Sequence, residues 1–260
     1  MATAEFSHNH MTSMQGDIRA AAAGTTIVLV HGAFVDGSGW RAVHDRLTRD
    51  GCRVVVVQNA IRSLEDDVAN TRRAIAAAPG SVILVGHSYG GVVISEAGND
   101  PKVVALVYVT AFVADAGESV QTLTANHAPG GSKPPFLPTG DGYLLFDTSK
   151  FPEVFGQDLS PETSSFMAAA LKPWAIASMA GKVTAAAWRV KPSWYVVATD
   201  DRLVHPSLQR RMAESAGARV VEVAGSHAIY MTQPETIAMT IVQAARATAS
   251  SSLEAYPPHR

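Results

Sequence analysis

The fold is decided by the stretch Val82-Ile83-Leu84-Val85-Gly86-His87-Ser88-Tyr89-Gly90-Gly91. It places a G-x-S-x-G pentapeptide directly after a short apolar run and directly before a helical pattern over residues 92–98. A sharp strand-to-helix turn forces the serine into a strained backbone conformation and leaves no room for side chains two residues away. A chance glycine-flanked serine is the alternative, and the strand–turn–helix context disfavours it. We therefore expect Ser88 Oγ to be presented above a sheet.

Short apolar runs alternate with longer amphipathic stretches on both sides of this pentapeptide. The alternation is typical of a parallel sheet covered by helices on both faces. The sequence predicts six strands at residues 26–30, 53–58, 82–85, 103–110, 194–198 and 219–223. It predicts helices at residues 40–49, 64–78, 207–216 and 235–247.

The composition indicates one large folded unit. The 260 residues are 47% hydrophobic and 17% charged, enough to bury a sizeable core. A net charge of -2 and the lack of any Lys/Arg-rich run argue against a nucleic-acid partner. The single cysteine, Cys52, excludes an internal disulfide, and no Cys/His cluster has the spacing of a metal site, so we expect neither metal nor cofactor.

The apolar runs are far shorter than the roughly 20 residues of a membrane helix, so we expect no membrane association. The first residues lack the basic and apolar regions of a secretory signal, and a cytoplasmic location is expected by default. Residues 1–24 and the Ser-rich 248–260 are predicted to be disordered tails. The oligomeric state stays open between a monomer and a homodimer.

About 80 residues separate the fourth predicted strand from the fifth, far more than a βα crossover needs. We interpret residues 114–187 as an inserted cap on a core formed by residues 25–113 and 188–247. Within the cap, Ser160-Pro161-Glu162-Thr163 predicts a helix start, and residues 142–146 predict a short strand. A disordered excursion is the alternative, but the segment is too rich in large apolar residues for that.

A serine nucleophile needs a base, and the base needs a carboxylate that holds its tautomer. The sequence supplies both in order, with Asp201 just past the strand 194–198 and His227 just past the strand 219–223. Open α/β sheets place functional groups at such carboxyl ends of strands. Ser88, Asp201 and His227 are therefore the candidate catalytic triad.

Other residues compete for two of these roles. Only His227 follows the final strand, which favours it as base over His31, His44, His87, His127 and His205. For the acid, Asp200 is adjacent and Asp115 follows the preceding strand. Asp201 is favoured because strand alternation turns Asp200 the other way, and because Asp115 lies where the cap begins.

The chain resembles the α/β-hydrolase superfamily, in particular its small esterase and hydroxynitrile lyase branch, over about residues 25–247. The serine–aspartate–histidine order is that of this superfamily. The resemblance is carried by Val30-His31-Gly32-Ala33-Phe34 with Trp40, Gly86 to Gly91, Gly117-Glu118-Ser119, Asp200-Asp201-Arg202-Leu203-Val204-His205-Pro206, and Gly225-Ser226-His227 with Gln233-Pro234. It implies an α/β-hydrolase fold with a mostly parallel six-stranded sheet flanked by helices and an inserted cap.

The resemblance also implies an oxyanion hole. Its backbone N–H donors would be Ala33, after His31-Gly32, and Tyr89, after the nucleophile, each supplying about 3 to 4 kcal/mol. His31-Gly32 also has a purely structural interpretation, as the end of the first strand, and both are compatible. Trp40 is interpreted as a core residue rather than a ligand contact.

The leading functional hypothesis is a serine carboxylesterase acting on a small-molecule ester through an acyl-enzyme. Lyases of the branch carry a threonine after the first-strand histidine and a lysine after the catalytic histidine, where this chain has Gly32 and Ala228. Hydroxynitrile lyase chemistry is therefore the disfavoured alternative, beside a ligand-binding protein on the same fold. Perhydrolysis and cofactor-free oxygenation leave no mark in the sequence.

The cap favours an apolar or aromatic substrate, because it contains Phe151, Phe155, Phe166, Met167 and Trp174. A helix stripe of such residues is also typical of a core. The sequence therefore assigns none of them to substrate binding.

Overall fold

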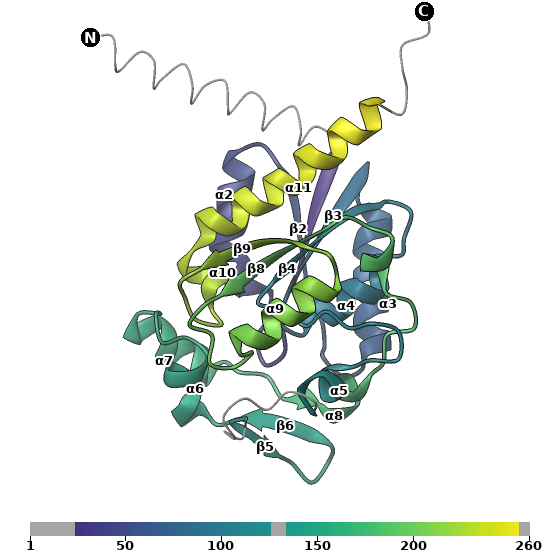
Figure 1. The fold of residues 1–260 in the computed structure, drawn as a ribbon. Coiled ribbons are helices and arrows are strands. Elements are labelled where there is room, and N and C mark those ends of the chain that lie inside the picture. The colour runs from purple at the N-terminus through teal and green to yellow at the C-terminus, as the bar shows by residue number, and fades with distance from the viewer. Residues whose placement is uncertain (1–23, 126–133, 255–260) are drawn as a thin grey trace, which may run out of the picture.

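The computed structural model of the protein describes residues 24–125 and 134–254 (Figure 1). Its centre is a six-stranded sheet in the order β2-β1-β3-β4-β8-β9, with parallel pairing throughout. The strands are β1 (Thr25–Val30), β2 (Arg53–Val57), β3 (Ser81–His87), β4 (Val103–Val109), β8 (Ser193–Ala198) and β9 (Arg219–Val223). The six predicted strands are confirmed, and each end lies within two residues of the expected position.

Alternate side chains of the central strands enter two separate hydrophobic cores. In β1, Ile27 and Leu29 belong to one core, and Val28 and Val30 belong to the other. Helices α2 and α11 cover the first core, whereas α3, α4 and α9 cover the second. The helices over the sheet are α2 (Arg41–Arg49), α3 (Leu64–Ala77), α4 (Gly90–Ala97), α9 (Pro206–Ser215) and α11 (Pro234–Glu254). Burial on both faces explains why the strands are apolar throughout.

Trp40 lies in η1 (Gly37–Trp40), just before α2, and its side chain is fully buried against Tyr230. This confirms its interpretation as a core residue. The helix predicted to end at residue 247 continues as α11 to Glu254, so the prediction of a disordered tail from residue 248 is wrong for its first residues. Hydroxyl side chains fit inside a helix by bonding back one turn, as Thr248 Oγ1 does to the Ala244 carbonyl at 3.1 Å.

The segment predicted as a cap contains a second, three-stranded antiparallel sheet in the order β5-β6-β7. Figure 1 shows it with α6 and α7 at the end of the molecule opposite the last turns of α11. The predicted strand at 142–146 is β6, and the predicted helix start is confirmed, because Ser160 caps α7 by accepting the Thr163 N–H. The remaining bounds are α5 (Val120–Ala125), β5 (Phe136–Pro138), β6 (Tyr143–Phe146), η3 (Thr148–Lys150), α6 (Phe151–Val154), α7 (Pro161–Ala169), β7 (Trp174–Ala175), α8 (Ile176–Ala180), η4 (Ala187–Arg189) and α10 (Ile229–Thr232).

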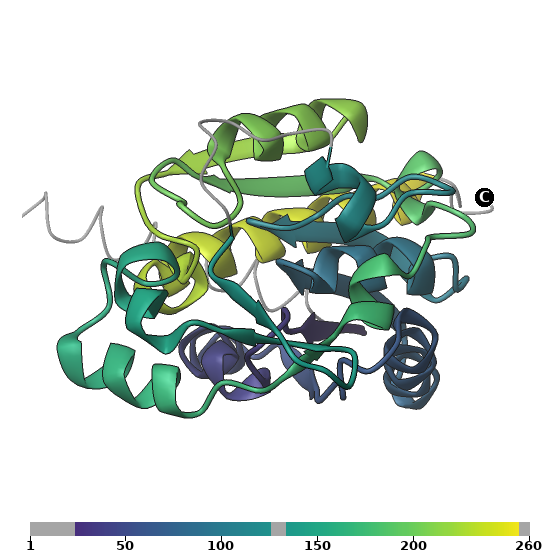
Figure 2. The same ribbon diagram turned by 90° about the horizontal axis from the view of Figure 1, so that it is seen from below.

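The cap shares a hydrophobic core with one face of the central sheet. Phe146, Phe151, Phe155 and Trp174 all belong to the same buried cluster as Val28 of β1. Seen from below, the cap elements lie across the carboxyl edge of the sheet (Figure 2). Among the helices that the structure describes, none is long and apolar enough to cross a membrane.

Candidate active site

The turn between β3 and α4 presents Ser88 at the carboxyl edge of the sheet. Ser88 has a φ of 54°, in the left-handed region that side chains disfavour. A Cβ atom added to Gly86 would lie 2.6 Å from the Gly90 carbonyl oxygen, and one added to Gly90 would lie 2.6 Å from that of Val30. Only glycine fits at both positions, so contact between backbones accounts for the spacing of the pentapeptide.

Asp201 and His227 form a fully buried pair at the same edge of the sheet. Asp201 follows β8 and His227 follows β9, and their side chains have no exposed surface. The Nδ1–H of His227 donates to Oδ2 of Asp201 over 2.8 Å. With the proton on Nδ1, Nε2 is the ring atom left to accept a proton, as a general base must.

The competing acids do not contact His227. Asp200 turns away and accepts the N–H of Gly225 at 3.1 Å through Oδ2. Asp115, at the start of the cap, is paired with the guanidinium of Arg189. Of the two, only Asp200 lies beside the acid position, and strand alternation explains its opposite orientation.

The competing histidines have other partners. His44 pairs with Asp45, and His205 caps α9 by accepting the Ser207 N–H. His127 lies outside the described residues.

His87 supports His227 from the neighbouring position of the Ser88 turn. The two rings lie 4.7 Å apart between centroids, and Nε2–H of His87 donates to the backbone oxygen of His227 at 2.9 Å. Complete burial and the adjacent His227 hold the pKa of His87 well below its usual value. A neutral His87 thus ties the backbone of His227 to the residue that precedes Ser88.

The Ser88–His227 hydrogen bond is not formed in this structure. Nε2 of His227 is buried, and it has no hydrogen-bond partner among the described residues. Catalytic hydrogen bonds are often long without substrate and tighten when it binds. The structure therefore brings all three candidate triad residues to one edge, with one of the two triad hydrogen bonds in place.

Ala33 and Tyr89 line the same cavity as Ser88. Within the described part of the chain, neither backbone N–H donates to a protein acceptor. Two unpaired N–H groups beside a serine hydroxyl are what an oxyanion hole requires.

His31 holds the peptide group that precedes Ala33. Its Nδ1–H donates to the Gly32 carbonyl at 2.8 Å, and its Nε2 accepts the Asn59 N–H at 2.9 Å. Burial lowers the pKa of His31 to about 4, so the ring is neutral at pH 7 and is able to accept. Since the Gly32 carbonyl and the Ala33 N–H belong to one rigid plane, fixing the carbonyl orients the N–H.

The cavity above Ser88 is small and apolar. Its free volume is about 70 Å³, and its lining contains no charged side chain among the described residues. Of the five apolar cap residues noted in the sequence, Phe155 and Trp174 line it, Phe151 is buried elsewhere in the core, and Phe166 is 73% exposed. The site therefore suits a small uncharged group.

A larger open groove of about 1200 Å³ adjoins this cavity. The two share the side chains of Phe112, Thr124, Pro134, Phe136, Leu203 and Val204. Its lining contains charges of both signs, from Lys150, Arg202 and Arg210 and from Asp147, Glu153, Asp200 and Asp201. The groove gives the remainder of a substrate room outside the inner cavity.

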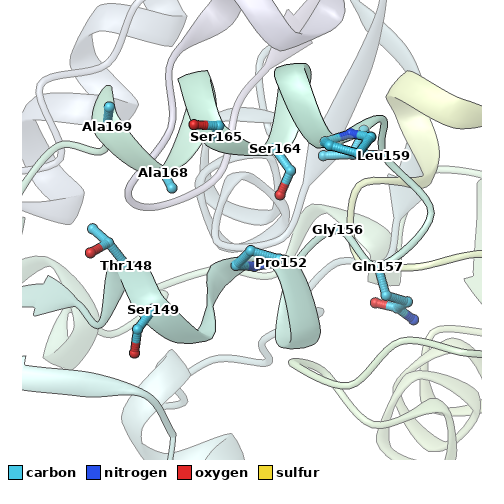
Figure 3. A pocket seen from close by; sticks show the side chains of 11 residues that line it. Thr148, Ser149, Pro152, Gly156, Gln157, Leu159, Ser164, Ser165, Ala168 and Ala169 are labelled. Carbon is cyan, nitrogen blue, oxygen red and sulfur yellow. The ribbon is translucent and has the colours of Figure 1, made fainter.

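A separate hollow of about 630 Å³ lies in the cap between α6 and α7 (Figure 3). It is lined by side chains such as Thr148, Pro152, Ser164 and Ala168, and by none of the candidate catalytic residues. The hollow is therefore separate from the candidate active site.

Sequence reasoning missed several residues that support the site. Gln209 donates to Asp201, Asp67 accepts the hydroxyl of Tyr89, and Lys172 donates its backbone N–H to the Phe34 carbonyl. A buried glutamine one turn into a helix is a weak signal, because burial is not visible in a single sequence. The other two contacts join segments far apart in the chain and leave no local pattern.

Comparisons with known proteins identify relatives that match most of this chain. The pyrethroid hydrolase of Sphingobium wenxiniae is 29% identical over 254 residues, covering 86% of this chain and 89% of that protein. The Alpha/beta hydrolase nvfD of Aspergillus novofumigatus is 27% identical over 241 residues, covering 84% and 96%. The crystal structure of a pyrethroid hydrolase from Sphingobium faniae matches with a TM-score of 0.75 at 27% identity, covering 87% of this chain and 99% of that one.

The family relationship rests on most of the chain. A model of the alpha/beta hydrolase family matches residues 27–240, which include the Ser88 turn, Asp201 and His227. The resemblance seen in the sequence is confirmed by this match. The chain belongs to the alpha/beta hydrolase family.

Proposed function

We propose that this protein is a serine carboxylesterase that cleaves small apolar or aromatic esters through an acyl-enzyme. The observation that carries the proposal is the buried Asp201–His227 hydrogen bond at the same edge of the sheet as the strained Ser88, whose cavity is also lined by the two residues with unpaired N–H groups. Hydrolases among its relatives, including two pyrethroid hydrolases, support an ester-type substrate.

In the acylation step, Ser88 Oγ attacks the ester carbonyl while His227 Nε2 takes its proton. Asp201 stabilises the resulting imidazolium through Nδ1–H. The Ala33 and Tyr89 N–H groups bind the negative oxygen of the tetrahedral intermediate. The intermediate then collapses, the C–O bond to the alcohol breaks, and His227 returns the proton to the leaving alcohol.

In the deacylation step, His227 removes a proton from water, whose oxygen attacks the acyl carbon. Collapse of this second intermediate breaks the bond to Ser88, and His227 returns the proton to the serine oxygen. The carboxylic acid leaves and the enzyme is regenerated.

Hydroxynitrile lyase activity is not favoured. Ala228, the position of the lyase lysine, is fully buried and carries no ammonium group. Lys172, whose backbone N–H donates to the Phe34 carbonyl, donates an Nζ–H to the Asn59 carbonyl and does not line the cavity. No described group is placed to stabilise departing cyanide.

The proposal is tested by hydrolysis of p-nitrophenyl acetate, butyrate and octanoate by the wild type and Ser88→Ala. We expect turnover that falls with acyl chain length and decreases by a factor of about 10³ or more in Ser88→Ala. Labelling by a fluorophosphonate should modify Ser88 alone. A folded wild type that neither turns over these esters nor is labelled would contradict the proposal, and release of cyanide from mandelonitrile above the spontaneous rate would favour the lyase.

A further inference from the structure

The carboxylate of Asp201 is saturated with hydrogen bonds. Its Oδ1 accepts the backbone N–H groups of Leu203 at 2.8 Å and Val204 at 2.9 Å. Its Oδ2 accepts His227 Nδ1–H at 2.8 Å and Gln209 Nε2–H at 2.8 Å. Four donors fill the lone-pair sites of the two oxygens. Among the described residues, Gln209 is therefore the only side chain besides the candidate base His227 that donates a hydrogen bond to Asp201.

The amide of Gln209 is fully buried, and all three of its contacts agree on one orientation. Nε2–H groups donate to Asp201 Oδ2 and to the Val204 carbonyl at 2.7 Å, while Oε1 accepts the Ala198 N–H at 3.1 Å. A flipped amide would set its oxygen against a carboxylate and a carbonyl, and its NH₂ against an N–H. The network therefore fixes Gln209 as a donor to Asp201.

These three contacts tie together the elements that carry the acid. Ala198 is the last residue of β8, Val204 lies in the loop after Asp201, and Gln209 lies in the first turns of α9. The side chain of Gln209 thus closes the loop 198–209 around the carboxylate from inside. Because the loop is held at both ends and at the Asp201 carboxylate, Oδ2 of Asp201 has a fixed position relative to β9. His227 lies in the loop that follows β9.

We propose that Gln209 is a positioning residue of the active site, which holds the Asp201 carboxylate in the orientation that serves His227. The inference rests on the proposed roles of Asp201 and His227. Gln209 shares Oδ2 with the His227 Nδ1–H, so it fixes the lone pair that the imidazole uses and stabilises the negative charge there. Without it, Oδ2 keeps only the His227 donor, and the carboxylate is held by that bond and by the two backbone N–H groups on Oδ1.

The first test uses Gln209→Met, which keeps the length of the side chain and removes all its hydrogen bonds. We expect kcat to fall about 10- to 100-fold, the loss of one hydrogen bond to a charged group, with KM unchanged. The matched control is Met212→Ala, a buried residue on the same helix that makes none of the hydrogen bonds to Asp201 in the described part of the chain. It should lower Tm and leave kcat near the wild-type value.

The second test uses Gln209→Glu, which keeps the shape but replaces the N–H donor with a carboxyl group. Protonated, this group donates to Asp201; ionised, it repels it. The variant should therefore lose activity as pH rises over a range in which the wild type gains it. The titratable groups facing this pair are His227, beside which His87 packs, and Tyr195 of β8, whose burial raises its pKa well above the usual value.

A third measurement does not depend on ester turnover. The far-downfield ¹H NMR signal of His227 Nδ1–H, assigned by its loss in His227→Ala, should shift or broaden in Gln209→Met and stay in place in Met212→Ala. A merely structural role for Gln209 would move Tm without moving this signal.

The outcomes separate this inference from the proposed function. An active, fluorophosphonate-labelled wild type whose Gln209→Met variant keeps kcat and the downfield signal would overturn the role of Gln209 alone. The role of Gln209 would also be overturned if Gln209→Glu kept the wild-type pH profile. It would be overturned as well if the loss of kcat in Gln209→Met and in Met212→Ala were in the same proportion to the loss of Tm. A wild type without turnover or labelling would overturn the proposed function, and this inference with it.

Discussion

The ring of Phe155 stands edge-on against the imidazole of His227, at 84° and 4.9 Å between ring centroids. The backbone oxygen of Phe155 accepts the N–H of Ala228 at 3.0 Å, and Asp158 Oδ2 accepts the N–H of Ser226 at 3.0 Å. The loop that carries the candidate base is therefore held from both sides by the cap. The cap is part of the site's architecture, because it fixes the backbone on either side of His227.

We expect Phe155→Ala to impair both stability and turnover. Phe155 is buried, and its removal leaves a cavity beside His227, which costs about 3–5 kcal/mol in the free energy of unfolding. kcat should also fall, because the ring no longer restrains the imidazole. Phe166→Ala is the matched control, since its side chain is 73% exposed and its loss should cost under about 0.5 kcal/mol. Urea unfolding and ester turnover measure both effects, and equal effects of the two variants would contradict this account.

The identity of the acid is tested by three substitutions of similar size. Asp201→Asn should reduce kcat by about 10³- to 10⁴-fold, because an amide selects the wrong tautomer of His227. Asp200→Asn and Asp115→Asn should retain most of the activity, since their carboxylates bond to Gly225 and Arg189 instead. Steady-state rates on p-nitrophenyl acetate provide the comparison. A larger loss in Asp200→Asn than in Asp201→Asn would reassign the acid.

The buried neutral His31 predicts a specific loss of stability in acid. Its pKa falls from 6.5 to about 4 on folding, so the folded state binds fewer protons than the unfolded state between these values. The stability linked to His31 is complete above pH 6.5 and is lost as pH falls towards 4, by about 3 kcal/mol.

Urea unfolding of the wild type and His31→Gln from pH 7.5 to pH 4 measures how the free energy of unfolding changes with pH. His44→Gln is the control, because the His44 side chain is partly exposed. The slope should flatten only in His31→Gln, even though that variant is less stable overall. An unchanged slope in His31→Gln would refute the assignment.

Cys52 should react slowly with thiol reagents in the native protein. It is buried, and burial raises the pKa of its thiol to about 11, so almost no thiolate is present at pH 8. We expect the rate of iodoacetamide labelling to increase by at least about 100-fold in denaturing urea. Mass spectrometry of the intact chain follows the reaction. Rapid labelling of the folded protein would show that the β2 edge opens readily.

Gly90→Ala should disrupt the turn that presents Ser88. The added Cβ would lie 2.6 Å from the Val30 carbonyl oxygen and 2.7 Å from that of His31, and neither backbone group can rotate away. We expect a loss of about 1–3 kcal/mol in stability together with a loss of activity. Gly140→Ala is the control, because nothing lies within 4 Å of its Cβ position. Comparable Tm values for the two variants would argue against the steric explanation of the pentapeptide.

Much of the fold was predictable because it depends on local chemistry. The six strands follow from β-branched apolar runs, whose bounds differ from those observed by at most two residues. The cap was only partly predictable. β5 and β7 are three and two residues long, and such short strands are defined by their pairing with β6 rather than by periodicity.

The sequence by itself determined that Ser88 sits in a strained strand-to-helix turn, because glycines at both flanks have no other steric explanation in that context. It also determined that Asp201 and His227 follow parallel strands, which brings them to one edge of the sheet. Only the tertiary structure decided that Gln209 and His227 share one oxygen of Asp201, and that Phe155 of the cap packs on the base. The contacts made by His227 join segments far apart in the chain, and the Gln209–Asp201 contact depends on how the loop between two residues eight positions apart folds back. The packing of the whole core sets both, and no local pattern encodes it.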